Sequence, residues 1–270
     1  MKGLAEDIAG KTALVTGASS GIGRAIGIRF AKAGLKVVAL GRSLEGLRET
    51  EAAIQDIGGQ CHLIQTDISE SGAMDIAMDQ AVAAFGQVDI LVNNAGVMYM
   101  DDPVHADRVR WEKMLNINLL AVIEGCTAAI RHMRASNIDG KIINISSLAS
   151  RLMGSGVYGA SKIAVEKYTQ ELRETLENDS IRVTTIIPGG FSTNLGRDMS
   201  QASRDAFQRK MGQKVVEAQP DEDGRTPYFG LADDVARTVL FAAAQPTYLN
   251  ISELVVRPAR NIDPSAFSES

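Results

Sequence analysis

The sequence has few of the residues that build metal centres and disulfide frameworks. Its 270 residues include two cysteines and three histidines. Cys61 and Cys126 lie far apart without a Cys-x-x-Cys spacing, and the histidines are scattered with no partner at ligand spacing. Structural zinc sites and disulfide-stabilised domains need clustered ligands or paired cysteines. We therefore expect no metal site and no disulfide, and two reduced thiols are typical of a cytoplasmic protein.

Long hydrophobic runs and an excess of positive charge are missing as well. No run of about 18 apolar residues occurs, which argues against a transmembrane helix. The first ten residues carry Lys2, Glu6 and Asp7 and have no apolar core of a signal peptide. The net charge is −5 and no basic patch stands out, so a nucleic acid is not an expected partner. These absences predict a cytoplasmic protein that acts away from membranes.

What the sequence does contain is a regular alternation of two patterns. Short β-branched apolar runs, typical of strands buried on both faces, occupy residues 12–16, 36–40, 62–65, 88–92, 141–145, 182–187 and 254–256. Amphipathic helical patterns separate them at residues 22–33, 44–57, 71–85, 108–133, 157–177 and 233–244. This order predicts an α/β protein, a doubly wound Rossmann-type fold with a seven-stranded parallel sheet. We expect residues 1–270 to form a single domain.

One region, residues 194–228, interrupts the alternation. It is polar, contains Pro220 and Pro227, and follows directly on a predicted strand. A segment inserted after a strand end commonly covers a ligand, which predicts a substrate lid. The alternative is a surface excursion without a role in binding.

The first predicted strand runs into a glycine-rich turn before a helix begins. The turn has the spacing Gly-x-x-x-Gly-x-Gly. Glycines at such a turn let the backbone approach a pyrophosphate, and the helix N-terminus offers free N–H groups to it. A tight loop without a ligand is the alternative, but a strand before the turn and a helix after it favour a dinucleotide site. The expected binding residues are Gly17, Ser19, Ser20, Gly21, Ile22 and Gly23.

The end of the second predicted strand indicates which dinucleotide binds. Rossmann sites for NAD place a carboxylate there, whereas an arginine accommodates the 2′-phosphate of NADP. This chain has Gly41-Arg42-Ser43 and no carboxylate at that point. Arg42 could also be an ordinary solvated side chain, but the missing carboxylate favours NADP as the cofactor.

Three further motifs follow later strands. Asn93-Asn94-Ala95-Gly96 follows the fourth strand, Ser146-Ser147 follows the fifth, and Tyr158-Gly159-Ala160-Ser161-Lys162 opens a helix. Together with the glycine turn, and in this order, they resemble the short-chain dehydrogenase/reductase family from about Gly10 to Pro258. The resemblance implies an oxidoreductase that transfers a hydride between NADP(H) and a small-molecule ketone, aldehyde or secondary alcohol.

Tyr158 and Lys162 suit an acid/base role in that chemistry. Four residues apart, they share one face of a helix. A free tyrosine has a pKa near 10, too high for a base at neutral pH. A unit charge about 4 Å away at an effective dielectric near 20 is worth roughly 4 kcal/mol, or about three pKa units. We therefore predict that Lys162 lowers the pKa of Tyr158, and the resemblance implies that Lys162 also binds the nicotinamide ribose.

The resemblance implies two further catalytic residues, each with an alternative. The serine that holds the substrate oxygen corresponds to Ser147, although its spacing from Tyr158 leaves Ser146 open. Asn118 matches the asparagine that holds a proton-relay water near the lysine, with Asn116 as the alternative.

The resemblance also extends the cofactor site and implies an oligomer. Asp67 and Ile68 resemble the pair that contacts adenine. Asn94, Ala95 and Gly96 would lie at the cofactor's edge, and Pro188, Gly189 and Thr193 resemble the segment that grips the nicotinamide carboxamide. Family members are commonly joined through the two long helices beside the fifth strand, so a homodimer or homotetramer is expected.

Substrate and function leave alternatives open. Positions after strand ends predict an apolar pocket and hence an apolar carbonyl or alcohol. These positions are Met98, Leu148, Leu152, Met153, Phe191 and Leu195. Residues 249–254 with Arg257-Pro258 instead resemble a subgroup that includes reductases of small hydroxy acids and aldehydes, whose substrates are polar. Rival functions are a cofactor-binding sensor without turnover, and a non-redox lyase or epimerase on a related scaffold.

Overall fold

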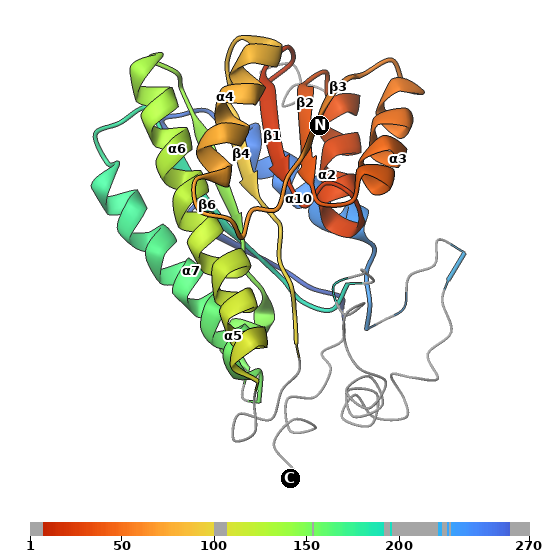
Figure 1. Cartoon of the computed structure of the whole chain (residues 1–270), viewed down its shortest axis with the longest axis vertical. Coiled ribbons are helices and arrows are strands. Elements are labelled where there is room, and N and C mark those ends of the chain that lie inside the picture. The colour runs from red at the N-terminus through yellow and green to blue at the C-terminus, as the bar shows by residue number, and fades with distance from the viewer. Residues whose placement is uncertain are drawn as a thin grey trace.

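The computed structural model describes residues 8–99, 107–152, 154–191, 195, 221–222, 226 and 228–259. Its centre is a seven-stranded sheet of order β3-β2-β1-β4-β5-β6-β7, in which every neighbouring pair is parallel (Figure 1). The strands are β1 Thr12–Thr16, β2 Lys36–Gly41, β3 Gln60–Gln65, β4 Ile90–Asn93, β5 Lys141–Ile145, β6 Arg182–Pro188 and β7 Glu253–Val256.

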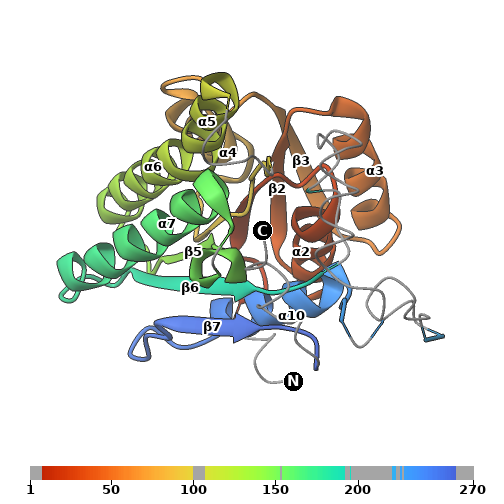
Figure 2. The same cartoon turned by 90° about the horizontal axis from the view of Figure 1, so that it is seen from below.

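Helices cover both faces of this sheet, as crossover connections between parallel strands require. One face carries α4, α6 and α7, with α5 beside them, and the other carries α2, α3 and α10 (Figure 2). The helices of the first face are α4 Ala73–Phe85, α5 Arg108–Leu115, α6 Ala121–Ala135 and α7 Gly156–Thr175. Those of the second face are α2 Gly21–Lys32, α3 Leu44–Gln55 and α10 Ala232–Ala243.

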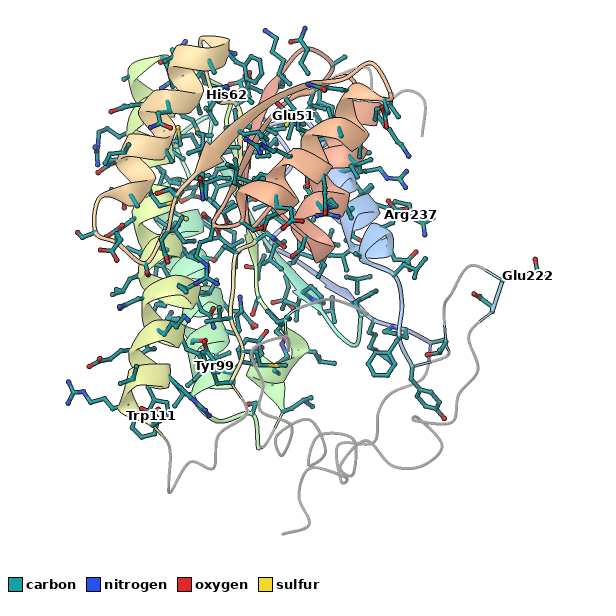
Figure 3. The ribbon with its side chains drawn as sticks, turned by 45° about the vertical axis from the view of Figure 1, so that its right-hand side comes forward. Glu51, His62, Tyr99, Trp111, Glu222 and Arg237 are labelled. Atoms are coloured by element: carbon teal, nitrogen blue, oxygen red, sulfur yellow. The ribbon has the colours of Figure 1, made fainter. Side chains whose placement is uncertain are left out.

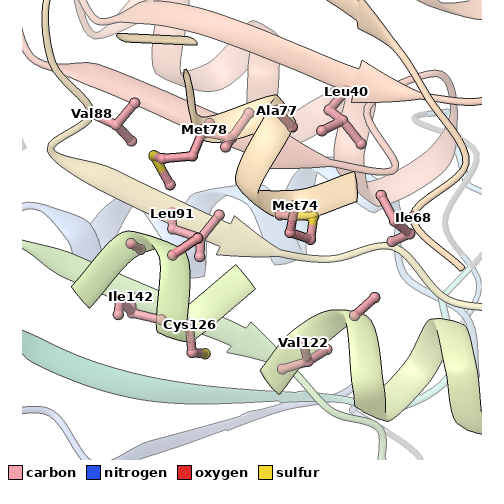
Figure 4. Close-up of a cluster of buried hydrophobic side chains, with 14 of the residues drawn as sticks. Leu40, Ile68, Met74, Ala77, Met78, Val88, Leu91, Val122, Cys126 and Ile142 are labelled. Atoms are coloured by element: carbon pink, nitrogen blue, oxygen red, sulfur yellow. The ribbon is translucent and has the colours of Figure 1, made fainter. Parts of the chain in front are cut away.

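The core lies in two layers because successive strand residues point to opposite faces. Along β1, Leu14 packs in the layer under α4 and α6, whereas Ala13 and Val15 pack under α2 and α10. The first layer includes Met74, Leu91 and Ile142 (Figure 4). Strands buried on both faces explain the near-continuous apolar runs of the sequence.

The predicted fold is confirmed. All seven predicted strands are present, and those at 12–16 and 141–145 have the predicted bounds. The predicted helix over residues 108–133 is one continuous helical stretch, but it contains a π-helical segment, η1 Asn116–Leu120. A short 3₁₀ segment, η2 Leu148–Arg151, follows β5 and was not predicted. Both short segments carry residues of the site described below.

The stretch Arg108–Ala135 is, by length and composition, the one helix of the described residues that could cross a membrane, and half of its most apolar window is buried in the protein. Its buried residues belong to the first core layer, among them Met114, Val122 and Met133. The apolar character of this stretch is thus used to pack against the sheet.

Most of the proposed lid at residues 194–228 lies outside the described residues. The described residue Phe191 pairs with Gly230 in an isolated parallel bridge, which closes the two ends of that region on each other.

The described histidines and cysteines belong to no cluster of three metal-ligating side chains. His62 lies at the end of the molecule opposite to Tyr99, which follows the carboxyl end of β4 (Figure 3). His132 accepts a hydrogen bond from the Val88 amide through Nε2, at 3.1 Å. Cys61 and Cys126 are free thiols, and burial raises the pKa of each to about 12. His105 lies outside the described residues.

Core packing on α4 gives a direct stability test. The Met74 side chain is fully buried, whereas Ile76 on the same helix is 60% exposed. Replacing a buried methionine by alanine typically costs about 2–5 kcal/mol, and an exposed substitution changes stability by about 0.5 kcal/mol or less. We expect Met74→Ala to lower the free energy of unfolding in urea by that larger amount and Ile76→Ala to change it little. Equal losses in the two variants would contradict the packing described here.

Candidate active site

The site lies where the strand order reverses, between the carboxyl ends of β1 and β4. Open α/β sheets bind ligands at this switch point, because the loops after the two strands diverge to opposite faces. The Thr16 hydroxyl accepts hydrogen bonds from the Asn94 and Ala95 amides, both at 3.0 Å, and Asn94 Nδ2 donates to the Thr16 carbonyl at 2.9 Å. These bonds join the predicted Asn94-Ala95-Gly96 segment to the glycine turn.

The glycine turn requires its glycines. Gly17 has φ of +68°, and a Cβ there would lie 2.9 Å from the Ala95 Cα. A Cβ on Gly23 would lie 2.3 Å from the Gly17 carbonyl oxygen. Because side chains cannot approach backbone atoms so closely, the first turn of α2 packs against the strand end only with glycine at these positions.

The N-terminus of α2 is suited to an anion. Ser20 is the N-cap residue, but its side chain makes no capping hydrogen bond, and the first turn contains no acidic residue. The first N–H groups of a helix have no partner within the helix and carry the positive end of its dipole. The turn therefore fits the pyrophosphate of a dinucleotide. Ser19 is buried, and its carbonyl accepts a hydrogen bond from Arg24, while Ile22 packs on the second core layer.

The predicted adenosine end is built from two strands. Arg42, just after β2, lies 3.8 Å from the carboxylate of Asp67, which follows β3. Burial alone would raise the pKa of Asp67, but hydrogen bonds from Ser69 and the charge of Arg42 outweigh it and hold that pKa below its usual value. The sequence shows no carboxylate at the tip of β2, yet the neighbouring strand brings one to Arg42. Ile68 is buried beside Asp67 in the first core layer.

At the other end of the site, the Ser147 hydroxyl accepts a hydrogen bond from the Ala149 amide at 3.2 Å and lies near enough to the Tyr158 phenol to lower its pKa. Tyr158 is 3% exposed and lies in the first turn of α7, whereas Ser147 is the N-cap of η2. Ser146 points elsewhere: its hydroxyl donates to the Glu166 carboxylate at 2.6 Å and lies 3.2 Å from the Lys162 carbonyl. The two adjacent serines therefore have different partners, because successive residues of an extended strand end face opposite ways.

Lys162 is also buried, at 3% exposure, and its ammonium donates to the Ile145 carbonyl at 2.9 Å. Burial lowers its pKa to about 8, and the nearby Glu166 carboxylate acts in the opposite direction. Burial raises the pKa of Tyr158, and the nearby Ser147 hydroxyl lowers it only in part. The predicted lowering of that pKa is wrong, because desolvation of the phenolate outweighs the favourable effect of Ser147.

Asn118 lies inside the π-helical segment and is fully buried. Its Oδ1 accepts from the Val97 amide and its Nδ2 donates to the Val97 carbonyl, both at 2.9 Å. A Cβ placed on Gly96 would lie 3.3 Å from Asn118 Oδ1 and 3.5 Å from Lys162 Nζ, so these two side chains converge on Gly96. π-Helical turns occur frequently at functional sites. Asn116, the alternative, is only partly buried at the start of the segment.

The remaining predicted residues belong to the carboxamide segment and to the substrate pocket, and the structure describes some of them. Pro188 ends β6, and a Cβ on Gly189 would lie 2.8 Å from the Arg257 Cβ and 3.7 Å from Leu148. Met98 and Leu195 pack beside the first core layer and Phe191 beside the second. Thr193 and Met153 lie outside the described residues. Among the residues that the structure describes, no three acidic, histidine or cysteine side chains gather as metal ligands.

Two residues of the site were missed by the sequence analysis. Thr16 joins the two strand ends through its hydroxyl, and Glu166 reaches the serine turn from α7. Thr16 carries a weak signal, since a hydroxyl residue stands at the last position of an apolar strand. The spacing of Glu166 four residues after Lys162 is a signal for a shared helix face, but many exposed pairs have it.

The sheet is doubly wound, has a glycine turn at its switch point, and carries Tyr158 and Lys162 on α7. These features define a dinucleotide-dependent oxidoreductase. Residues 11–204 match the family described as short chain dehydrogenase. The chain belongs to this family, the short-chain dehydrogenases/reductases, and is an enzyme of the oxidoreductase class.

Several relatives cover nearly the whole chain. 3beta-Hydroxysteroid dehydrogenase 1 of Eggerthella lenta is 33% identical over 96% of this chain and 97% of its own length. Sulfoacetaldehyde reductase 2 of Chromohalobacter salexigens is 32% identical over 92% and 94%. A metagenomic short-chain oxidoreductase, solved in complex with NADP, is 31% identical with a TM-score of 0.74, covering 93% of this chain and 99% of that one.

The glycine turn can be tested with a matched pair on α2. In Gly23→Ala the new Cβ would meet the Gly17 carbonyl oxygen, whereas in Gly27→Ala its nearest neighbour is Val37 Cγ1 at an ordinary 3.5 Å. We expect Gly23→Ala to weaken NADPH and NADH binding at least tenfold, measured by nucleotide fluorescence. Gly27→Ala should bind as the parent does and gain up to about 1 kcal/mol of stability, because alanine favours helix. Unchanged affinity in Gly23→Ala would show that the turn does not hold the dinucleotide.

Proposed function

We propose that the protein transfers a hydride between NADP(H) and a ketone, aldehyde or secondary alcohol, with Tyr158 as the general acid/base. The observation that carries this proposal is the burial of Tyr158 and Lys162 one helical turn apart on α7, with Ser147 beside the phenol. A sensor without turnover needs none of these three groups in one dry site, nor does a lyase that uses the nucleotide only structurally.

Each of the four side chains has a separate role in carbonyl reduction. When bound, the reduced nicotinamide supplies the hydride. Tyr158 donates its proton to the carbonyl oxygen, and Ser147 stabilises the charge that develops there. A raised pKa keeps Tyr158 protonated at neutral pH, which suits reduction. Lys162 binds the nicotinamide ribose and stabilises the tyrosinate left behind, and Asn118 holds the water that returns the proton.

In the opposite direction, tyrosinate must accept the alcohol proton. Burial disfavours that charged form. Alcohol oxidation by this site therefore requires a pH above neutrality, or a positive charge close to the phenol. Lys162 supplies such a charge below its pKa of about 8.

We assign NADP as the cofactor from Arg42 and the family resemblance. Gly17, Ser19, Ser20, Gly21, Ile22 and Gly23 would hold the pyrophosphate. Asp67 and Ile68 would contact adenine, Asn94, Ala95 and Gly96 would border the cofactor, and Pro188, Gly189 and Thr193 would hold the carboxamide. The NADP complex of the metagenomic relative supports this choice. Arg42 would exchange its contact with Asp67 for the 2′-phosphate.

We place an apolar carbonyl or alcohol in the substrate pocket. Met98, Leu148, Leu152, Phe191 and Leu195 are apolar, and one relative is a hydroxysteroid dehydrogenase. A small polar aldehyde is the second substrate class, because another relative is a sulfoacetaldehyde reductase.

We further propose that the enzyme is a cytoplasmic homodimer or homotetramer. Val109, Leu115 and Leu120 on the α5–η1 stretch, and Ile163 on α7, are large apolar side chains left exposed by the single chain, between 38% and 70%. Such side chains on the helices that family members use for association support an assembly.

Replacement of the site residues tests the reaction. We expect Tyr158→Phe to lower kcat for NADPH-dependent carbonyl reduction by about 100- to 10,000-fold, the usual contribution of a general acid. Ser147→Ala should cost about 100- to 1,000-fold, as for loss of one donor to a developing oxyanion. Ser146→Ala should keep at least a tenth of the activity, since its hydroxyl faces Glu166. NADPH consumption against apolar and carboxylated carbonyls measures all three, and a Tyr158→Phe variant as fast as the parent refutes the proposed role.

Replacement of Arg42 tests the proposed preference for NADP. A hydrogen bond to a charged group is worth about 1.5–3 kcal/mol, so Arg42→Ala should lower kcat/KM with NADPH by about 10- to 150-fold. The value with NADH should stay within twofold. Arg48→Ala is the control. It removes an exposed arginine from α3, the helix that follows Arg42, and should alter neither value. A parent enzyme that prefers NADH would overturn the assignment.

A further inference from the structure

Glu166 is a largely buried carboxylate that the proposed reaction does not use. It lies on α7 one turn beyond Lys162, and its side chain is 11% exposed. One oxygen, Oε1, accepts hydrogen bonds from the hydroxyls of Ser146, at 2.6 Å, and Ser150. The other lies 3.4 Å from the Arg151 guanidinium.

These contacts join the two elements that carry Ser147 and Tyr158. Ser146 and Ser150 flank Ser147 on the turn after β5, and the Ser150 hydroxyl also lies 2.7 Å from the Ser147 carbonyl. Glu166 belongs to the helix of Tyr158 and Lys162. A single carboxylate therefore holds the serine turn against the helix at the point where Ser147 must meet Tyr158.

Glu166 is also the carboxylate one helical turn beyond Lys162 on α7. Asn118 and the Ile145 carbonyl, which lie beside the ammonium, are neutral. Arg151, from η2, lies on the far side of Glu166 and is paired in turn with Glu253 of β7 at 2.7 Å. Burial lowers the pKa of Lys162 to about 8, and Glu166 opposes that effect.

We propose that Glu166 is a positioning residue of this active site, which holds the Ser147 turn against α7 and places a negative charge one helical turn from the buried Lys162 ammonium. The inference rests on the proposed function. An ionised carboxylate is unfavourable in such a position unless it is hydrogen-bonded and paired, and here two hydroxyls and the Arg151 guanidinium satisfy it.

Glu166→Gln tests the electrostatic part, because glutamine keeps the size and an accepting oxygen but removes the charge. In the parent, carbonyl reduction should fall as pH rises through about 8, where Lys162 loses its proton. In Glu166→Gln we expect this basic limb to lie at least half a pH unit lower, with kcat at pH 7 reduced about tenfold. Glu171→Gln removes an exposed charge from the same helix and should match the parent.

Ser150→Ala separates the two parts of the role. It removes one hydrogen bond to the carboxylate without changing any charge, so kcat should fall while the basic limb stays in place. The proposal is overturned if the fall in kcat at basic pH occurs at the same pH in Glu166→Gln as in the parent. It is also overturned if Ser150→Ala shifts that fall to lower pH by as much as Glu166→Gln does. If Glu166→Gln does not fold, Glu166→Asp decides: an unmoved limb with a lower kcat supports the proposal, and a displaced limb overturns it.

A readout without turnover distinguishes this inference from the proposed function. The pKa of Lys162 can be followed by NMR of the parent and Glu166→Gln proteins with isotope-labelled lysine side chains. We expect about 8 in the parent and a lower value in the variant. If no carbonyl is reduced but this pKa falls, the proposed function fails and the electrostatic role of Glu166 stands. An unchanged pKa overturns that role whatever the activity.

Discussion

The site depends on keeping a positive charge in a place from which water is excluded. The Lys162 ammonium lies beneath the helix–strand junction with one backbone carbonyl as its direct partner. A cation in such surroundings tends to lose its proton, which is why its pKa falls to about 8. The Glu166 carboxylate, one helical turn away on α7, opposes that loss of the proton.

The sheet makes this burial possible. In a parallel sheet covered on both faces, the carboxyl ends of β4 and β5 lie side by side, and the start of α7 lies next to them. Asn118 and Lys162 converge on Gly96 at this point. The π-helical segment turns Asn118 inward at that depth, with its amide held on the Val97 backbone. A regular helix would advance the side chains by about 100° per residue, so the extra residue per turn re-aims the asparagine.

The two ends of the site are held in place in different ways, one by the backbone and one by side chains. The proposed dinucleotide end has backbone determinants, namely the glycines that allow close contact and the helix N-terminus without a side-chain cap. The proposed catalytic end has side chains that hold one another through Ser146, Ser150 and Glu166. A site formed by backbone atoms tolerates many different side chains around it. A hydrogen-bond network of side chains is weakened when any one of its residues is replaced.

The sequence alone determined the element order, the seven strands, the glycine turn and the placing of Tyr158 and Lys162 on one helix, because periodicity and helical spacing are local properties. Tertiary structure alone decided the partners of Ser146 and Ser147, the approach of Asp67 to Arg42, and the π-helical turn at Asn118. It also decided the direction in which the pKa of Tyr158 moves. Spacing along a helix shows that a lysine is near, but only burial shows how strongly desolvation opposes the charge.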